Sequence, residues 1–87
     1  MRPSPALASV QDHAIRAAID AMDGTLLMAQ ALVEGGRRID LAGLDREAGR
    51  LCMAVMALGE AEARRLRPAL EALRRRVDGL AVSLASG

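Results

Sequence analysis

The sequence predicts an all-α fold, an antiparallel helical hairpin elaborated into a three-helix bundle with left-handed, coiled-coil-like packing. In three separate segments, apolar residues recur at alternating spacings of four and three, which is the spacing of a helical seam. The chain has 18 alanines and no Phe, Trp or Tyr, so its core must use small and aliphatic side chains, which suit close helix contacts. Glycines 35–36, followed by Asp40, indicate a turn between the first two segments.

The first helix is predicted from about Ala6 to Glu34, after a disordered stretch at 1–5 in which prolines discourage a helix. Its seam consists of Ile15, Ile19, Met22, Leu26, Ala29 and Val33. A second line lies beside the seam and is expected to widen the apolar face: Ala14, Ala18, Ala21, Thr25, Met28 and Leu32. Leu27 falls among the polar residues and is expected to be exposed.

The turn is the best specified stretch of the chain. Gly35 suits the left-handed position after a helix, and Asp40 suits the N-cap of the next helix. Ile39 and Leu44 fit the two positions of a hydrophobic staple around that cap. The turn predicts that the first two helices run antiparallel.

The second helix is predicted over residues 41–58, with a seam at Leu44, Ala48, Leu51, Val55 and Leu58. Residues 51–58 are apolar on every side of the helix. Such a helix is normally buried all round, and a small domain cannot cover it completely. We therefore predict a partner-binding surface made of Leu51, Met53, Val55, Met56 and Leu58, with Leu27 of the first helix.

The third helix is predicted over residues 60–84, and residues 85–87 are expected to fray. Its seam is Leu66, Leu70, Leu73, Val77, Leu80 and Leu84, and it passes through Pro68 without a phase change, which favours a kink. Gly59 either ends the second helix or only interrupts it. The alternative is thus a hairpin whose second arm is one long, bent helix.

Composition points to a cytoplasmic protein. The net charge of +1 creates no global field toward nucleic acid or a membrane surface. The longest uninterrupted apolar run, 51–58, is far shorter than a membrane span, and no signal-peptide pattern follows the N-terminus. Cys52 is the only cysteine, which excludes an internal disulfide and fits a reducing compartment.

Residues that could carry chemistry have simpler interpretations here. His13 is a single histidine without other metal ligands nearby, and Cys52 fits a small buried hydrophobe. Asp12, Asp20 and Asp23 are interpreted as a solvated acidic face. We therefore predict that the chain is not an enzyme and has no catalytic residues, cofactor or metal.

The segments 26–35 and 40–47 resemble the hairpin region of small flagellar export chaperones. The similarity consists of the paired Leu26-Leu27, an Ala-Leu before the glycine turn, and a Leu-x-x-Leu start at Leu41 and Leu44. The resemblance implies a helical hairpin or bundle whose apolar helix surface binds the secretion-competent end of a flagellar subunit.

The predicted function is a non-enzymatic protein-interaction module, such as a flagellar export chaperone or adaptor, that binds an apolar segment of a partner protein. The alternative is a structural homodimer joined through residues 51–58. A minor alternative is a nucleic-acid-associated regulator acting through the basic last helix. Nucleic acid is disfavoured because acidic residues are interleaved with Arg64, Arg65, Arg67, Arg74, Arg75 and Arg76 and no aromatic side chain is available for stacking.

Overall fold

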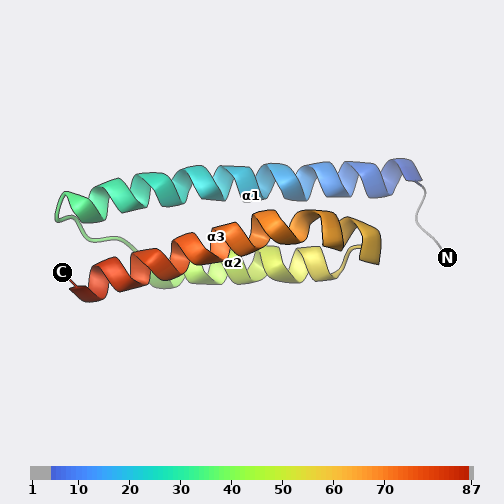
Figure 1. Ribbon diagram of the computed structural model, residues 1–87. Helices are drawn as coiled ribbons and strands as arrows, with labels where there is room; N and C mark the ends of the chain where they lie inside the picture. The colour runs from blue at the N-terminus through green and yellow to red at the C-terminus, as the bar shows by residue number, and fades with distance from the viewer. Residues whose placement is uncertain (1–4, 87) are drawn as a thin grey trace.

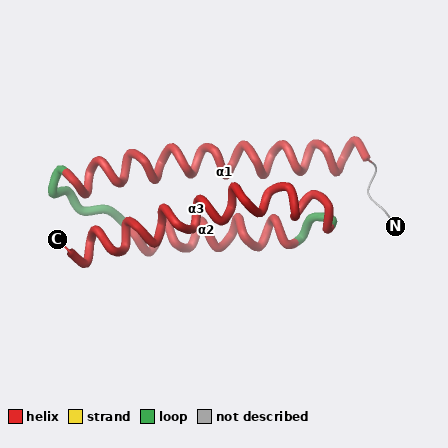
Figure 2. The backbone as a smooth tube through the Cα atoms, viewed as in Figure 1, coloured by secondary structure: helices red, strands yellow, loops and turns green. Residues whose placement is uncertain are grey.

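The structure, a computed structural model, describes residues 5–86, with side chains from residue 10 to residue 85. The described residues form three helices and no strand: α1 (Pro5–Glu34), α2 (Leu41–Met56) and α3 (Glu60–Ser86) (Figures 1 and 2). The predicted all-α three-helix bundle is confirmed. The predicted left-handed packing stays a prediction. Residues 1–4 and Gly87, where disorder and fraying are expected, lie outside the described residues.

The three helices form a rod of about 50 × 18 × 16 Å. Figure 1 shows that α1 and α3 run in the same direction. α2 runs antiparallel to both and leads from the end of α1 to the start of α3. α3 packs extensively against both other helices, whereas α1 and α2 contact each other least. The α1–α2 edge is therefore the most open edge of the bundle.

The helix α2 ends two residues before its predicted end, which separates it from α3. Its C-cap is Ala57, and the amide of Leu58 donates to the carbonyl of Val55 at 3.1 Å in a tightened last turn. The carbonyl of Gly59 then accepts from the amide of Ala63 at 3.0 Å, so Gly59 is the residue that directly precedes the next helix. The alternative of one long second arm is wrong.

The helix α3 runs through Pro68 as a single element and extends through Ser86, past the predicted start of fraying. Pro68 is exposed, so its ring lies on the solvent side of the helix. At the other end of the bundle, α1 begins at Pro5, where a missing amide proton does no harm in a first helical turn.

The end of α1 is a Schellman motif with its left-handed residue at Gly36. The amide of Gly36 donates to the carbonyl of Val33 at 3.0 Å, and the amide of Arg37 donates to that of Leu32 at 2.8 Å. Gly36 has φ of 80°, a conformation that glycine adopts without steric cost. The prediction that Gly35 holds this position is wrong by one residue, because the amide of Gly35 still donates to the carbonyl of Ala31 at 3.0 Å.

The predicted cap of α2 is confirmed. The amide of Gly43 donates to Oδ1 of Asp40 at 2.9 Å, which satisfies one of the free amides of the first turn. A side chain at Gly43 would overlap that carboxylate, so the glycine leaves room for the cap.

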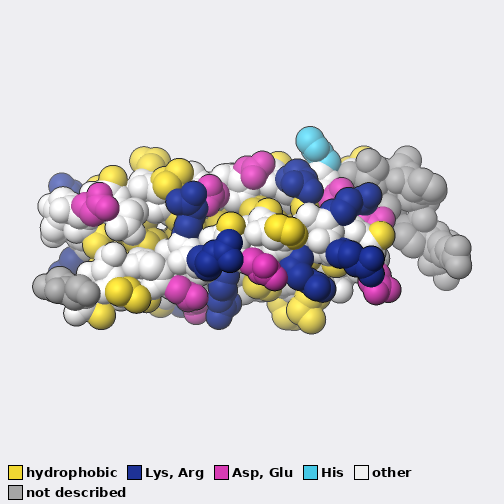
Figure 3. All heavy atoms as spheres, in the orientation of Figure 1, with side chains coloured by type: hydrophobic (Ala, Val, Ile, Leu, Met, Phe, Trp, Pro, Cys, Tyr) yellow, Lys and Arg dark blue, Asp and Glu magenta, His cyan; other side chains and the backbone are white. Residues whose placement is uncertain are grey.

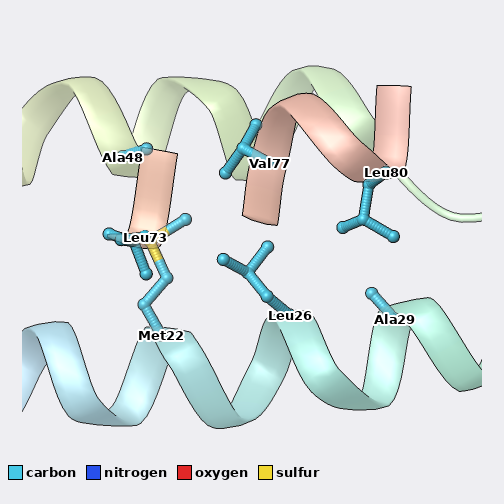
Figure 4. Packing of buried hydrophobic residues seen from close by; sticks show 7 residues of the cluster. All are labelled: Met22, Leu26, Ala29, Ala48, Leu73, Val77 and Leu80. Atoms are coloured by element: carbon cyan, nitrogen blue, oxygen red, sulfur yellow. The ribbon is translucent and has the colours of Figure 1, made fainter. Parts of the chain in front are cut away.

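The core consists of one stripe from each helix. Figure 4 shows side chains of α1 and α3 pointing toward each other, with Ala48 of α2 beside them. Its larger cluster contains Met22, Leu26, Ala29, Ala48, Leu73, Val77 and Leu80, and a second cluster contains Ile19, Val55 and Leu66. All ten belong to the predicted seams. Burial of these side chains, rather than polar contacts, holds the helices together.

Leu26 and Leu27 offer a matched test of this core. Leu26 is 1% exposed and Leu27 is 52% exposed. We expect Leu26→Ala to lower the free energy of unfolding by about 2 to 5 kcal/mol, because it leaves a cavity. Leu27→Ala should cost less than about 1 kcal/mol. Urea unfolding followed by circular dichroism measures both, and equal losses would contradict the assigned core.

Asp40 allows a second test, of the turn. Asp40→Ala should lower the free energy of unfolding by about 1 kcal/mol, because it removes the acceptor for the Gly43 amide. Asp40→Asn keeps a capping oxygen and is the control, with an expected change below about 0.5 kcal/mol. If both variants lost the same stability, charge rather than capping would be responsible.

Candidate functional site

The predicted contact residues of α2 divide between the core and the surface. Val55 is 4% exposed and belongs to the core, and Leu51 and Leu58 are half-buried against the same core. A partner cannot reach Val55, so we remove it from the predicted contact set. The exposed members are Met53 and Met56, at 71% and 80%. The bundle therefore covers much of the run that the sequence predicted to be left open.

Leu27 lies at a different place from these methionines. It lines a small pocket with Leu26 and Gln30 of α1 and with Arg76, Gly79 and Leu80 of α3. The pocket lies along the α1–α3 edge of the rod. The predicted contact residues therefore do not form one continuous surface.

A long uncharged surface belongs to α1. Its second line, predicted to widen the apolar face, is exposed to solvent rather than packed in the core. We define the uncharged face of α1 as Val10, Ala14, Ala17, Ala18, Ala21, Gly24, Thr25, Met28, Ala31 and Leu32, all of them exposed. An exposed helix face normally carries charged side chains. This one has none over more than six turns.

Thr25 does not make this face polar. Its hydroxyl donates to the carbonyl of Ala21, one turn back, at 3.1 Å. A threonine bonded in this way satisfies its polar atom within its own helix. The face thus needs no polar partner, and its largest exposed apolar side chain is Met28, at 71%.

An open groove runs between the uncharged face of α1 and α2. Near the turn it includes an open pocket of about 550 Å³. Its apolar lining includes Met28, Leu32, Ile39 and Leu44. Three charged residues also border the pocket: Arg38, Asp40 and Glu47. The groove combines an apolar floor with charges at one end, an arrangement suited to a partner segment with an apolar stripe.

A second pocket continues along the same α1–α2 edge. It has a volume of about 310 Å³ and is lined by Gln11, Ala14, Ile15, Ala54, Ala57 and Leu58. Small side chains supply half of this lining. The groove is therefore lined by smaller side chains at this end of the helices and by larger ones near the turn.

The opposite edge, between α1 and α3, carries ion pairs that join the two helices. Asp23 pairs with Nε of Arg76 at 2.5 Å, and Asp12 lies 3.9 Å from Arg65. Within α3, Arg64 pairs with Glu60 at 3.1 Å. Asp12 and Asp23 are half-buried here, so their interpretation as part of a solvated face is wrong; Asp20 is exposed.

The charges of this edge alternate in sign. Figure 3 shows arginines interleaved with acidic side chains over α1 and α3, the two helices that face the viewer in this orientation. Because pairing of this kind is exposed or half-exposed, it contributes little to stability. It does distinguish this edge from the uncharged groove on the other side of α1.

The residues considered for chemistry occupy ordinary positions. His13 is exposed, and Cys52 is half-buried with a free thiol. Among the described residues, no group of His, Cys, Asp and Glu side chains could hold a metal ion. None of the helices in the described part of the chain has the length and apolar character needed to cross a membrane.

Comparisons with protein-family models, curated proteins and solved structures found no match to this chain. The surfaces of the chain itself are therefore the guide to its function. The sequence already contained the signal for the site, because the second line of α1 has the same four-three spacing as a core seam. That spacing indicates a packing surface without indicating whether the partner lies within the chain.

Proposed function

We propose that this protein is a non-enzymatic helical interaction module that binds through the uncharged face of α1 and the α1–α2 groove. One observation carries the proposal: α1 exposes a continuous face without charge, spaced like a helical seam and ending in Met28 and Leu32. Large exposed apolar surfaces mark sites of protein interaction. The flexible methionine suits a surface that adapts to its partner.

The groove favours a helical segment as the bound element. An amphipathic helix binds in an apolar groove through side chains that recur every three or four residues. The exposed line from Ala14 to Leu32 has the matching spacing. Arg38 and Glu47 beside the pocket near the turn provide contacts for polar residues that flank such a stripe.

The resemblance of the hairpin region to small flagellar export chaperones supports a finer proposal. In that proposal the protein is a chaperone or adaptor, and the groove shields an apolar helical end of a protein destined for export. The absence of charge on the face fits this task, since an apolar segment must be held away from water. The protein acts in the cytoplasm in this proposal.

Photo-crosslinking at two equally exposed positions tests the proposed surface. A photoreactive amino acid replaces Met28 in one variant and Met53 in the other, since each methionine is 71% exposed. After irradiation in the native cell, we expect covalent adducts to protein from position 28 and not from position 53. Mass spectrometry of the adducts identifies the bound segment.

The matched control introduces Leu32→Glu beside the photoreactive residue at position 28. A charge on the exposed face should reduce the adduct at least about tenfold, because binding would then require a buried unpaired carboxylate. Circular dichroism checks that this variant keeps its helix content. Absence of adducts at position 28 would overturn the proposal, and adducts confined to position 53 would return the site to α2.

A further inference from the structure

Three sulfur-bearing side chains lie within the last five residues of α2: Cys52, Met53 and Met56. We propose that they bind one copper(I) ion, through the thiolate of Cys52 and the thioethers of the two methionines. None of the three lines the pockets of the α1–α2 groove, so the site is independent of the proposed function. Its thioether ligands also distinguish it from a structural zinc site, which uses thiolate, imidazole and carboxylate ligands.

The helix spacing makes the three side chains neighbours. Met56 follows Cys52 by four residues and Met53 by three, and at these separations the Cβ atoms are about 5–6 Å apart. A methionine in a helix directs its side chain toward the preceding turn. The side chain of Met56 therefore extends over the turn that carries the other two sulfur atoms.

The distances suit coordination of a single ion. A metal–sulfur bond is about 2.3 Å long, so three sulfur atoms around one ion lie about 4 Å from each other. This separation is somewhat shorter than the spacing of the Cβ atoms, and side chains that converge outward from the helix can reach it. Met53 and Met56 have three rotatable bonds each, which lets both thioethers adjust to the position of the ion.

The fold itself does not use these sulfur atoms. Met53 and Met56 are exposed, and Cys52 is half-buried with a free thiol. Neither core cluster of the described residues contains any of the three. Met22, by contrast, is a member of the larger cluster. Core packing thus accounts for Met22 but not for the methionines of α2, which are available to a ligand.

The ligand set selects the metal. Thiolate and thioether ligands favour copper(I), whereas carboxylate and carbonyl oxygens suit magnesium, calcium and manganese. Residues 51–59 contain no Asp, Glu or His, so this stretch offers no side chain of the kind that harder ions prefer. One thiolate with two thioethers therefore indicates copper(I) rather than zinc or a divalent ion bound by oxygen.

The charge balance fits a monovalent ion. The carbonyl groups at the end of a helix carry a partial negative charge, and α2 has no basic residue in its last turn. A thiolate without a cation is therefore disfavoured at Cys52. Binding forms three copper–sulfur bonds, releases the thiol proton to water and changes no oxidation state. The bound site is neutral, because the thioethers add no charge.

Anaerobic titration of the full chain with copper(I), in competition with a chromogenic copper(I) chelator, measures the affinity of the site. We expect one ion per chain. Native mass spectrometry should show the added mass of one copper less one proton. X-ray absorption at the copper edge should show sulfur neighbours only, about three of them, at about 2.3 Å.

Variants of the methionines test whether the sulfur atoms act together. Met53→Leu and Met56→Leu each remove one thioether and conserve apolar volume. Each should weaken copper(I) affinity at least about tenfold, since even groups that only support a metal ligand contribute that much. Cys52→Ser should abolish binding of one ion per chain. The matched control is Met28→Leu, at a methionine as exposed as Met53 but on α1, and its affinity should not change.

Three results would overturn the site. One is failure of the natural chain to bind copper(I) in competition with the chelator. Another is unchanged affinity in both Met53→Leu and Met56→Leu, which would mean that Cys52 binds the ion alone. The third is an equal loss in Met28→Leu. Circular dichroism verifies the helix content of each variant. Failure of the copper site leaves the proposed function standing, because crosslinking from position 28 is measured without the metal.

Discussion

The apolar seam of α3 is the constraint on which the bundle depends. Leu66, Leu73 and Leu80 are almost inaccessible to solvent, and the seam packs against both other helices. Without aromatic residues, aliphatic side chains such as these must supply the hydrophobic stabilisation together with those of α1 and α2 that pack against them. The third helix packs on one side of the hairpin. The α1–α2 edge, on the other side, remains a groove.

The two turns determine which residues reach that groove. The Schellman motif at Gly36 and the cap at Asp40 reverse the chain within a few residues. Ile39 and Leu44 therefore lie beside the end of α1, where they line the pocket near the turn. At the other end, Gly59 directly precedes α3, after the short cap of α2. Short connections keep neighbouring helices antiparallel, and they leave the face of α1 uncovered by any loop.

Sequence spacing predicted the seams and the turn well because both depend on local chemistry. Each of the ten core residues lies on a predicted seam, and Asp40 caps α2 as expected. Spacing could not determine how many neighbours each helix has. Val55 was therefore predicted to be available to a partner although it is buried, and the spacing left open that Met28 is exposed. Those outcomes depend on where α3 packs, which is a tertiary property.

The charges of α1 explain why its outer face is more than an incidental apolar stripe. Its acidic residues Asp12 and Asp23 lie along the edge shared with α3, where the bundle closes around paired arginines. A helix with solvent on its outer side would be expected to place such residues outward. Here the solvent side carries Arg16 and Asp20, and beside them an uncharged stretch of alanine, glycine, methionine and a threonine whose hydroxyl is already bonded. The surface proposed to bind a partner is this uncharged stretch, which lies between the exposed charges of α1 and the α1–α2 groove.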